Sequence, residues 1–442
     1  MSSAWKVVVV LVSMVAATPT AWADPEEPAP AADPWLDPQA RTPSTTPAPP
    51  PIAEEPSAAE PSAPSGLREI QIHGFVSQGA FVSTANDYIG SSSRGSLEMF
   101  EAGFNLSTEV ADRLRVGIQL FSRDVGKFHD VSPRVDWAFL DYRVRPWFGI
   151  RAGVIKMPFG LYNEYSDIDS SRTPLLLPQS IYPVRNREAL LSHRGFSVYG
   201  THPMGGAGEL EYQAWLGSLS IPENALTIGG ATLDSIDTKY VTGAQMFWHP
   251  PIEGLRIGGS WLRASIDFNL VLSPENTAAV IMAGLVPADY DGRLLVAQRP
   301  TTFVIGSAEL IRGKWQLAAE YARSFKHQIT EPALIPTLEE DREGLYASAA
   351  YQHTERLALG LYYSLDHLEA SDRRGRDAMK YPERFYAYQR DLAASVRFDV
   401  NDHWLWKLEA HFMDGAAQLE LDAASRPERF WGMFLVRTTV TF

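Results

Sequence analysis

Arginine side chains recur at alternating positions along three consecutive stretches of the chain. The residues are Arg113, Arg115 and Arg123 in the first stretch, Arg143 and Arg145 in the second, and Arg151 in the third. In an extended strand, residues two apart point to the same side. A guanidinium group is permanently charged, and its fork of donors matches phosphate and carboxylate oxygens. The pattern therefore indicates either a wall that attracts anions or a generic solvated wall, in both cases provided that neighbouring strands bring the arginines together.

Acidic residues share the face predicted for these arginines, so the wall is not purely basic. They include Asp141, Glu211 and Glu409, while Arg397 and Arg437 add positive charge.

A second candidate site is the long connection over residues 157–193. Connections of this length are usually functional or disordered. Its charged residues are Asp167, Asp169, Arg172, Arg185 and Arg187, among others. If the connection folds into a barrel, these charges set a transverse field at a constriction. The alternative is an external flap over the barrel rim.

Strands are the elements that must position both sites. We expect them near 69–83, 95–110, 113–124, 134–146, 148–156, 194–202, 208–219, 238–249, 255–270, 298–312, 314–327, 343–354, 356–369, 386–400, 402–414 and 428–442. Together they predict an all-β chain that forms a transmembrane antiparallel β-barrel of about sixteen strands, an even number as in single-chain bacterial barrels.

The strands alternate between apolar and polar residues, as a wall between lipid and water requires. In one of them Val116, Ile118 and Leu120 oppose Arg115 and Gln119. Tight turns are expected on the periplasmic side. The long links near 157–193, 271–297, 328–342, 370–385 and 415–427 are expected outside the cell. A soluble β-sandwich is disfavoured because so many strands carry an apolar face.

Both ends of the chain agree with this interpretation. The last strand alternates from Phe434 to a terminal Phe442, which resembles the sorting signal of outer-membrane barrels. Residues 1–23 have a lysine, an apolar run and a small-x-small site, which predicts a cleaved signal peptide. A membrane anchor is the alternative, but the run is shorter than the roughly 20 residues of a spanning helix. The chain has no cysteine, so disulfides and thiolate chemistry are excluded.

Residues 24–67 are rich in proline, alanine and glutamate and should stay extended or disordered. We interpret them as a periplasmic spacer, with contact to the cell wall or a periplasmic partner as the alternative. The barrel then occupies residues 68–442. The net charge of −14 gives no basic excess that would suggest nucleic-acid binding.

The segment Arg151-Ala152-Gly153-Val154-Ile155-Lys156-Met157-Pro158-Phe159-Gly160 resembles the strand-then-loop signature of the phosphate-selective porin O/P family. Ile72-His73-Gly74-Phe75-Val76 resembles that family's first barrel strand. The resemblance implies a sixteen-stranded outer-membrane channel, commonly trimeric, with a basic lumen that passes anions. The phosphate-specific members are rich in lysine around the pore, and this chain is not.

The resulting hypothesis is a porin, exported to the bacterial outer membrane, that lets small hydrophilic solutes or anions diffuse passively. One alternative is a plugged structural or adhesive barrel whose loops bind a partner. Another is a barrel hydrolase, although the phosphate-loop, zinc-helix and nucleophile-elbow motifs of enzymes are missing from the sequence. No cofactor or metal is expected, and the histidines show no metal-ligand spacing.

Overall fold

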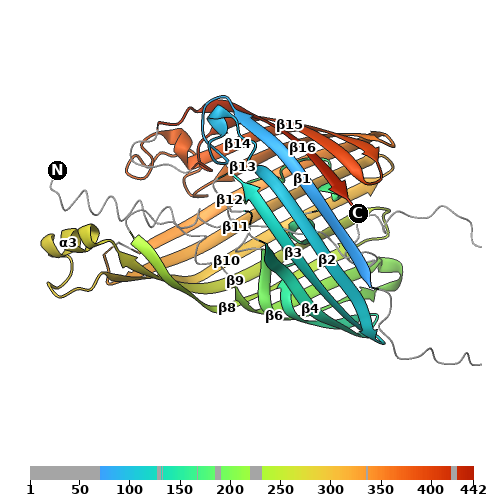
Figure 1. The fold of residues 1–442 in the computed structure, drawn as a ribbon, viewed down its shortest axis with the longest axis horizontal. Helices are drawn as coiled ribbons and strands as arrows, with labels where there is room; N and C mark the ends of the chain where they lie inside the picture. The colour runs from blue at the N-terminus through green and yellow to red at the C-terminus, as the bar shows by residue number, and fades with distance from the viewer. Residues whose placement is uncertain are drawn as a thin grey trace, which may run out of the picture.

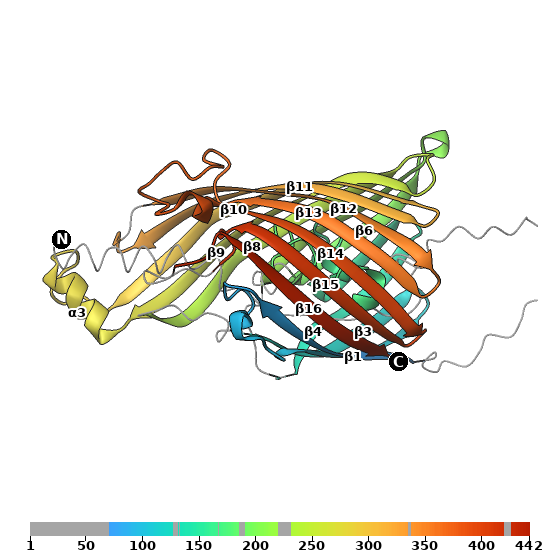
Figure 2. The same ribbon diagram turned by 90° about the horizontal axis from the view of Figure 1, so that it is seen from above.

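A computed structural model describes residues 70–126, 131, 133–166, 168–184, 191–219, 231–334, 337–419 and 426–442. Sixteen antiparallel strands form one closed barrel in chain order, and β1 pairs with β16 to complete it. The predicted fold is therefore confirmed. Figures 1 and 2 show the strands tilted around a single wall.

The strands lie close to the predicted ranges. They are β1 Gln71–Ser83, β2 Met99–Ala111, β3 Leu114–Val125, β4 Arg134–Arg145, β5 Phe148–Lys156, β6 Ser192–Pro203, β7 Glu209–Leu219, β8 Ala231–His249, β9 Leu255–Leu272, β10 Arg293–Arg312, β11 Trp315–Glu331, β12 Leu338–Thr354, β13 Leu357–His367, β14 Tyr388–Asn401, β15 Trp404–Gly415 and β16 Phe430–Thr441.

The wall has its apolar face outside and its polar face inside. On β15, Trp406 and Phe412 are exposed on the outer face, whereas Lys407, Glu409 and His411 are buried on the inner face. This is the arrangement expected of a barrel that meets lipid outside and encloses polar groups. Within the described residues, no helix is long and apolar enough to cross a membrane.

The two ends of the barrel differ. The C-terminus and the tight turns lie at one end, and the long connections lie at the other (Figure 2). Two of the tight turns use positive φ angles, at Arg113 (63°) and Gly313 (58°). The sequence predicted this asymmetry, with the tight turns on the periplasmic side.

Strands β8 to β12 are longer than predicted and project beyond the rest of the rim (Figure 1). The predicted long links at 271–297 and 328–342 are correspondingly too long, because strand residues occupy their ends. Helix α3, Pro274–Met282, lies at the tip of this extension. The cause of the error is local: β8 has register shifts at Leu233/Ser235 and Thr238/Tyr240. A bulge breaks the alternation of period two on which the prediction depends.

Candidate functional site

The connection between β5 and β6 folds into the barrel rather than over its rim. Its backbone N–H groups bond to inward-facing side chains: Gly160 N donates to Ser260 Oγ at 2.9 Å, and Leu161 N donates to Glu320 Oε1 at 2.8 Å. Leu175 N and Leu176 N donate to the two carboxylate oxygens of Glu409, at 2.7 and 2.8 Å. These acceptors lie on β9, β11 and β15, so the loop crosses the lumen.

Two wall carboxylates, Glu320 and Glu409, hold the loop, and Glu320 has the larger number of hydroxyl donors. It accepts hydrogen bonds from the hydroxyls of Ser307 at 2.5 Å and Tyr346 at 2.8 Å, and from that of Tyr182 on the loop. With the Leu161 N–H, four donors converge on one buried carboxylate. A buried carboxylate is tolerated when its oxygens are satisfied in this way.

A separate set of contacts, centred on Asp169 of the loop, joins the loop to β15 and β16. Lys407 Nζ lies 2.7 Å from Asp169 Oδ1, and Thr439 Oγ1 donates to Asp169 Oδ2 at 2.8 Å. Both charged side chains are almost fully buried. Burial alone would raise the pKa of Asp169, but the charges of Lys407 and Arg172 and the hydrogen bonds from Lys407 and Thr439 together outweigh it and lower that pKa. Asp169, predicted as a constriction charge, therefore anchors the loop to the wall.

A buried histidine on the wall supports the contact between Glu409 and the loop. His411 Nδ1 lies 3.0 Å from Asp391 Oδ2, and its Nε2 lies 3.0 Å from Glu409 Oε1. Because a carboxylate occupies each ring nitrogen, this imidazole has no free nitrogen with which to activate a hydroxyl nucleophile. Glu409 in turn holds the loop amides, so His411 orients the loop's acceptor.

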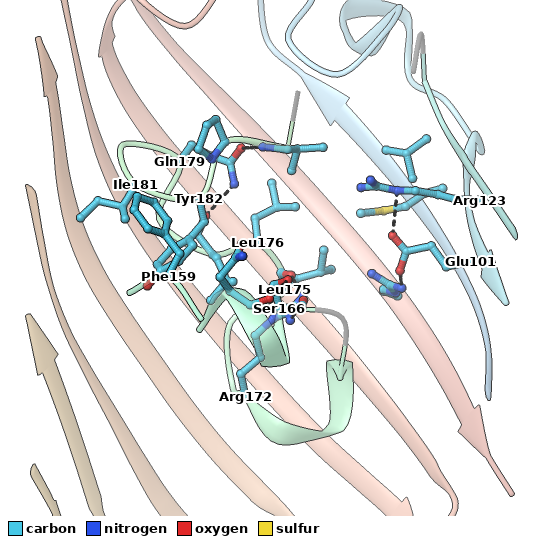
Figure 3. Close-up of a pocket in the computed structure, with 17 residues that line it drawn as sticks. Glu101, Arg123, Phe159, Ser166, Arg172, Leu175, Leu176, Gln179, Ile181 and Tyr182 are labelled. Atoms are coloured by element: carbon cyan, nitrogen blue, oxygen red, sulfur yellow. Dashed lines mark hydrogen bonds and ion pairs between the residues drawn. The ribbon is translucent and has the colours of Figure 1, made fainter. Parts of the chain in front are cut away.

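A cavity remains between the loop and the wall formed by β2, β3 and β16 (Figure 3). On the wall side, Arg123 Nε lies 3.1 Å from Glu101 Oε1, and Arg437 pairs with the same carboxylate. On the loop side, Arg172 faces the cavity and donates through Nη2 to Leu175 O at 3.1 Å. Three arginines and one acid thus line the space that the loop leaves open.

The structure separates the six predicted wall arginines into two groups. Arg115, Arg123, Arg143 and Arg151 lie on the inner face of β3, β4 and β5. Arg113 and Arg145 are exposed at the tight-turn ends of these strands, outside the enclosed wall. Among the loop residues, Arg172 lines the cavity, whereas Asp167, Arg185 and Arg187 lie outside the described residues.

Acidic partners offset part of the inner arginine charge. Arg151 Nε lies 2.8 Å from Asp141 Oδ2, and Tyr199 OH donates to Asp141 Oδ1 at 2.5 Å. The Arg151 guanidinium also lies over the Tyr199 ring, 4.2 Å from its centroid. The tight-turn half of this wall is therefore a paired, hydrogen-bonded surface rather than a row of free cations.

One loop carboxyl is poised to change charge near neutral pH. Burial raises the pKa of Glu164 to about 7. Its Oε2 accepts from Gln213 Nε2 at 3.2 Å. Its chain neighbour Asn163 lines the cavity, whereas the Glu164 carboxyl itself lies against Gln213 on β7.

Sequence reasoning did not single out Glu101, Glu320 or Lys407. The alternation of polar and apolar residues places each of them on the inner face, and this was the only sequence pattern that pointed to them. What it does not reveal is the cross-lumen distance to the loop. Among the residues that the structure describes, no three histidines or acids are placed to hold a metal ion.

No protein-family model matches the sequence, and no curated protein matches it. Solved structures do share the fold. A Salmonella typhi OmpF structure, in complex with daunomycin, has a TM-score of 0.55 at 11% identity over 84% of this chain and 97% of that chain. The outer-membrane-expressed OmpT of Vibrio cholerae has a TM-score of 0.50 at 10% identity over 86% of this chain and 99% of that chain. At these identities the likeness establishes the fold of an outer-membrane barrel.

Proposed function

We propose that this protein is an outer-membrane channel through which small hydrophilic solutes diffuse passively, with a preference for anions. The observation that carries the proposal is the cavity beside the inward loop, where Arg123, Arg437 and Arg172 outnumber the single acid Glu101. A cluster of guanidinium groups on the lining of a water-filled pore favours anions and repels cations.

The remaining parts of the proposal follow from the same architecture. The apolar outer face suits the outer membrane. Residues 1–23 would act as a cleaved signal peptide that directs export of the chain. The assembly is a homotrimer, as the resemblance implies. The preferred solutes are anions in general rather than phosphate, because this chain has few of the lysines that the phosphate-specific members carry around the pore. The chain has no catalytic role in this proposal.

Single-channel recording in a planar bilayer, with the reversal potential measured under a KCl gradient, tests the proposal. We expect stepwise conductance and a reversal potential that favours chloride. In the double variant Arg123→Gln/Arg172→Gln, the chloride-to-potassium permeability ratio should fall by roughly threefold or more, since two positive charges leave the cavity lining.

The matched control removes two arginines outside the cavity. Arg113→Gln/Arg145→Gln changes the same number of charges at exposed turns, and it should alter the ratio much less. Equal effects of the two double variants would contradict the assignment of selectivity to the cavity. A wild-type preference for potassium would contradict anion selectivity while keeping the channel.

A plugged structural barrel is the second candidate, and one observation favours it. The loop bonds to β9, β11 and β15, and Ser180 Oγ on the loop lies 2.8 Å from Ser364 Oγ on β13. A loop held at so many points fills much of the lumen. Silence from protein that is folded and inserted would favour this candidate over the channel.

A further inference from the structure

The outer face of β14, β15 and β16 changes from apolar to charged at the end with the long connections. On β15 the outward residues are Trp404, Trp406, Leu408, Ala410, Phe412 and then Asp414. At about 3.3 Å per residue and a tilt of roughly 40°, the run from Trp404 to Phe412 covers on the order of 20 Å along the membrane normal. Asp414 therefore lies at the outer edge of the apolar band, at the level of lipid headgroups.

Two arginines share this one carboxylate. Arg390 lies opposite Asp414 in the ladder and donates through Nη1 to Asp414 Oδ2 at 3.0 Å. Arg429 donates through Nε to Asp414 Oδ1 at 2.6 Å. The arginine side chains are 46% and 44% exposed, while that of Asp414 is 18% exposed. The cluster thus presents more positive than negative charge to its surroundings.

Aromatic rings hold both guanidinium groups in place. Arg390 lies over the Tyr388 ring, 4.9 Å from its centroid, and Arg429 lies over the Phe430 ring at 4.5 Å. Such stacking, together with the shared carboxylate, restricts the side chains before any ligand arrives. Pre-organised guanidinium groups with N–H donors to spare suit bidentate binding of phosphate.

An exposed apolar surface adjoins this cluster on the membrane side. Phe430 is 67% exposed in the same ladder row as Asp414, and Phe412 is 64% exposed in the row below. Leu392, opposite Phe412, continues the surface on β14. A ligand that fits both parts has an anionic head and apolar chains. A free anion would use the head site alone.

From this juxtaposition we infer that Arg390 and Arg429 form a binding site for a phosphate-bearing lipid of the outer leaflet, with its acyl chains on the Phe412 and Phe430 surface. The inference takes only the membrane location from the proposed function and does not depend on conductance. A silent barrel could still bind the lipid, and a conducting barrel could fail to do so.

Another part of the rim offers a matched comparison. Arg323 also stacks on an aromatic ring, that of Phe325 at 5.2 Å, and it pairs with Asp341. Arg373 pairs with Glu343. In this region each arginine has its own carboxylate, so the excess positive charge of the Asp414 cluster is missing.

Native mass spectrometry of the full-length protein in detergent micelles, titrated with bisphosphorylated lipid A, tests the inference. We expect Arg390→Gln/Arg429→Gln to bind this lipid at least roughly tenfold more weakly than the wild type, since it loses two charge-assisted contacts. Dephosphorylated lipid A should bind the wild type as weakly as bisphosphorylated lipid A binds the Arg390→Gln/Arg429→Gln variant. The control Arg323→Gln/Arg373→Gln should bind like the wild type.

Four results would overturn the inference. They are unchanged binding by the Arg390/Arg429 variant, equal binding of the dephosphorylated lipid, an equal loss in the control variant, and full competition by inorganic phosphate, which would identify a simple anion site. If the variant instead alters the mass of the oligomer and leaves lipid binding unchanged, the surface contacts a second copy of this chain. Circular dichroism of each variant verifies that the barrel has formed.

Discussion

The buried pair of Lys407 and Asp169 is the contact on which single side chains should matter most. Their side chains are 0% and 1% exposed, and Lys407 Nζ also donates to Asp169 O at 2.5 Å. Removing one member leaves the other as an uncompensated buried charge, which costs about 3–5 kcal/mol. Replacing both members with neutral groups of similar shape avoids most of that penalty.

We therefore expect Lys407→Met to release residues 168–181 of the loop, and Lys407→Met/Asp169→Asn to restore part of their protection. Hydrogen exchange measured by mass spectrometry on the folded barrel reports both effects. Lys314→Met is the control, because this lysine is exposed beside a tight turn and donates only to His353 O among its described contacts. Equal exchange in wild type and Lys407→Met would contradict the anchoring role.

At the residue scale, the sequence indicated sides but not partners. Alternation placed both Arg151 and Asp141 on the inner face, and they do lie there. Their ion pair depends on the register of β4 against β5, which sets these two residues directly opposite each other. Register comes from the bulges and turns of the whole sheet, so residue types alone could not predict that Arg151 is paired with Asp141.

Among the elements, the loop between β5 and β6 shows why its direction could not be predicted from its sequence. Its length and mixed charges were compatible with a flap or an inward fold. The inward fold is stable because wall carboxylates accept loop N–H groups, as Glu409 does for Leu175 and Leu176. Without the loop, Glu409 and Glu320 would lose these donors. That complementarity joins residues more than a hundred positions apart and is visible only in three dimensions.

The same loop should make ion selectivity depend on pH. The pKa of Glu164 is raised to about 7, so its carboxyl is neutral below that pH and negative above it. We expect the preference for chloride to be stronger at about pH 6 than at about pH 8, since one negative charge on the inward loop disappears in acid. Reversal potentials across this range measure the effect.

Glu164→Gln should remove the dependence and keep the acidic selectivity at both pH values. By linkage, a raised carboxyl pKa stabilises the docked loop at low pH. This contribution is complete below the unfolded value of 4.5 and is lost as the pH rises through about 7. A pH profile that is the same in wild type and Glu164→Gln would assign the titration to another group.

For the molecule as a whole, barrel closure is the feature that the sequence predicted best. Each strand had to alternate over many residues to separate lipid from the interior. This alternation can therefore be recognised in the sequence of each strand by itself. The strand ends beyond the membrane were predicted least well. There, bulges such as the shift between Gln298 and Thr301 interrupt the pattern, and the strands continue past them.

Closure also gives the C-terminal residue a structural role that can be separated from its predicted role as a sorting signal. Phe442 N donates to Gly74 O and Gly74 N donates to Phe442 O, both at 2.9 Å, so the last residue closes the end of the β1–β16 seam. A Cβ on Gly74 would lie 2.4 Å from the Phe442 ring, so the ring lies directly against the glycine. Two backbone hydrogen bonds contribute about 1 kcal/mol each. This is a small part of the stability of a closed barrel of sixteen strands.

Deleting Phe442 should therefore scarcely change the yield of purified protein refolded in detergent, while strongly lowering the amount of folded barrel in cell membranes. Gel mobility with and without heating measures the folded fraction in both settings. Phe442→Tyr retains the backbone bonds and an aromatic end, and it should behave like the wild type in both. A parallel loss in detergent and in cells would show that the terminal residue acts through barrel stability, whereas no loss in either setting would remove its predicted role in sorting.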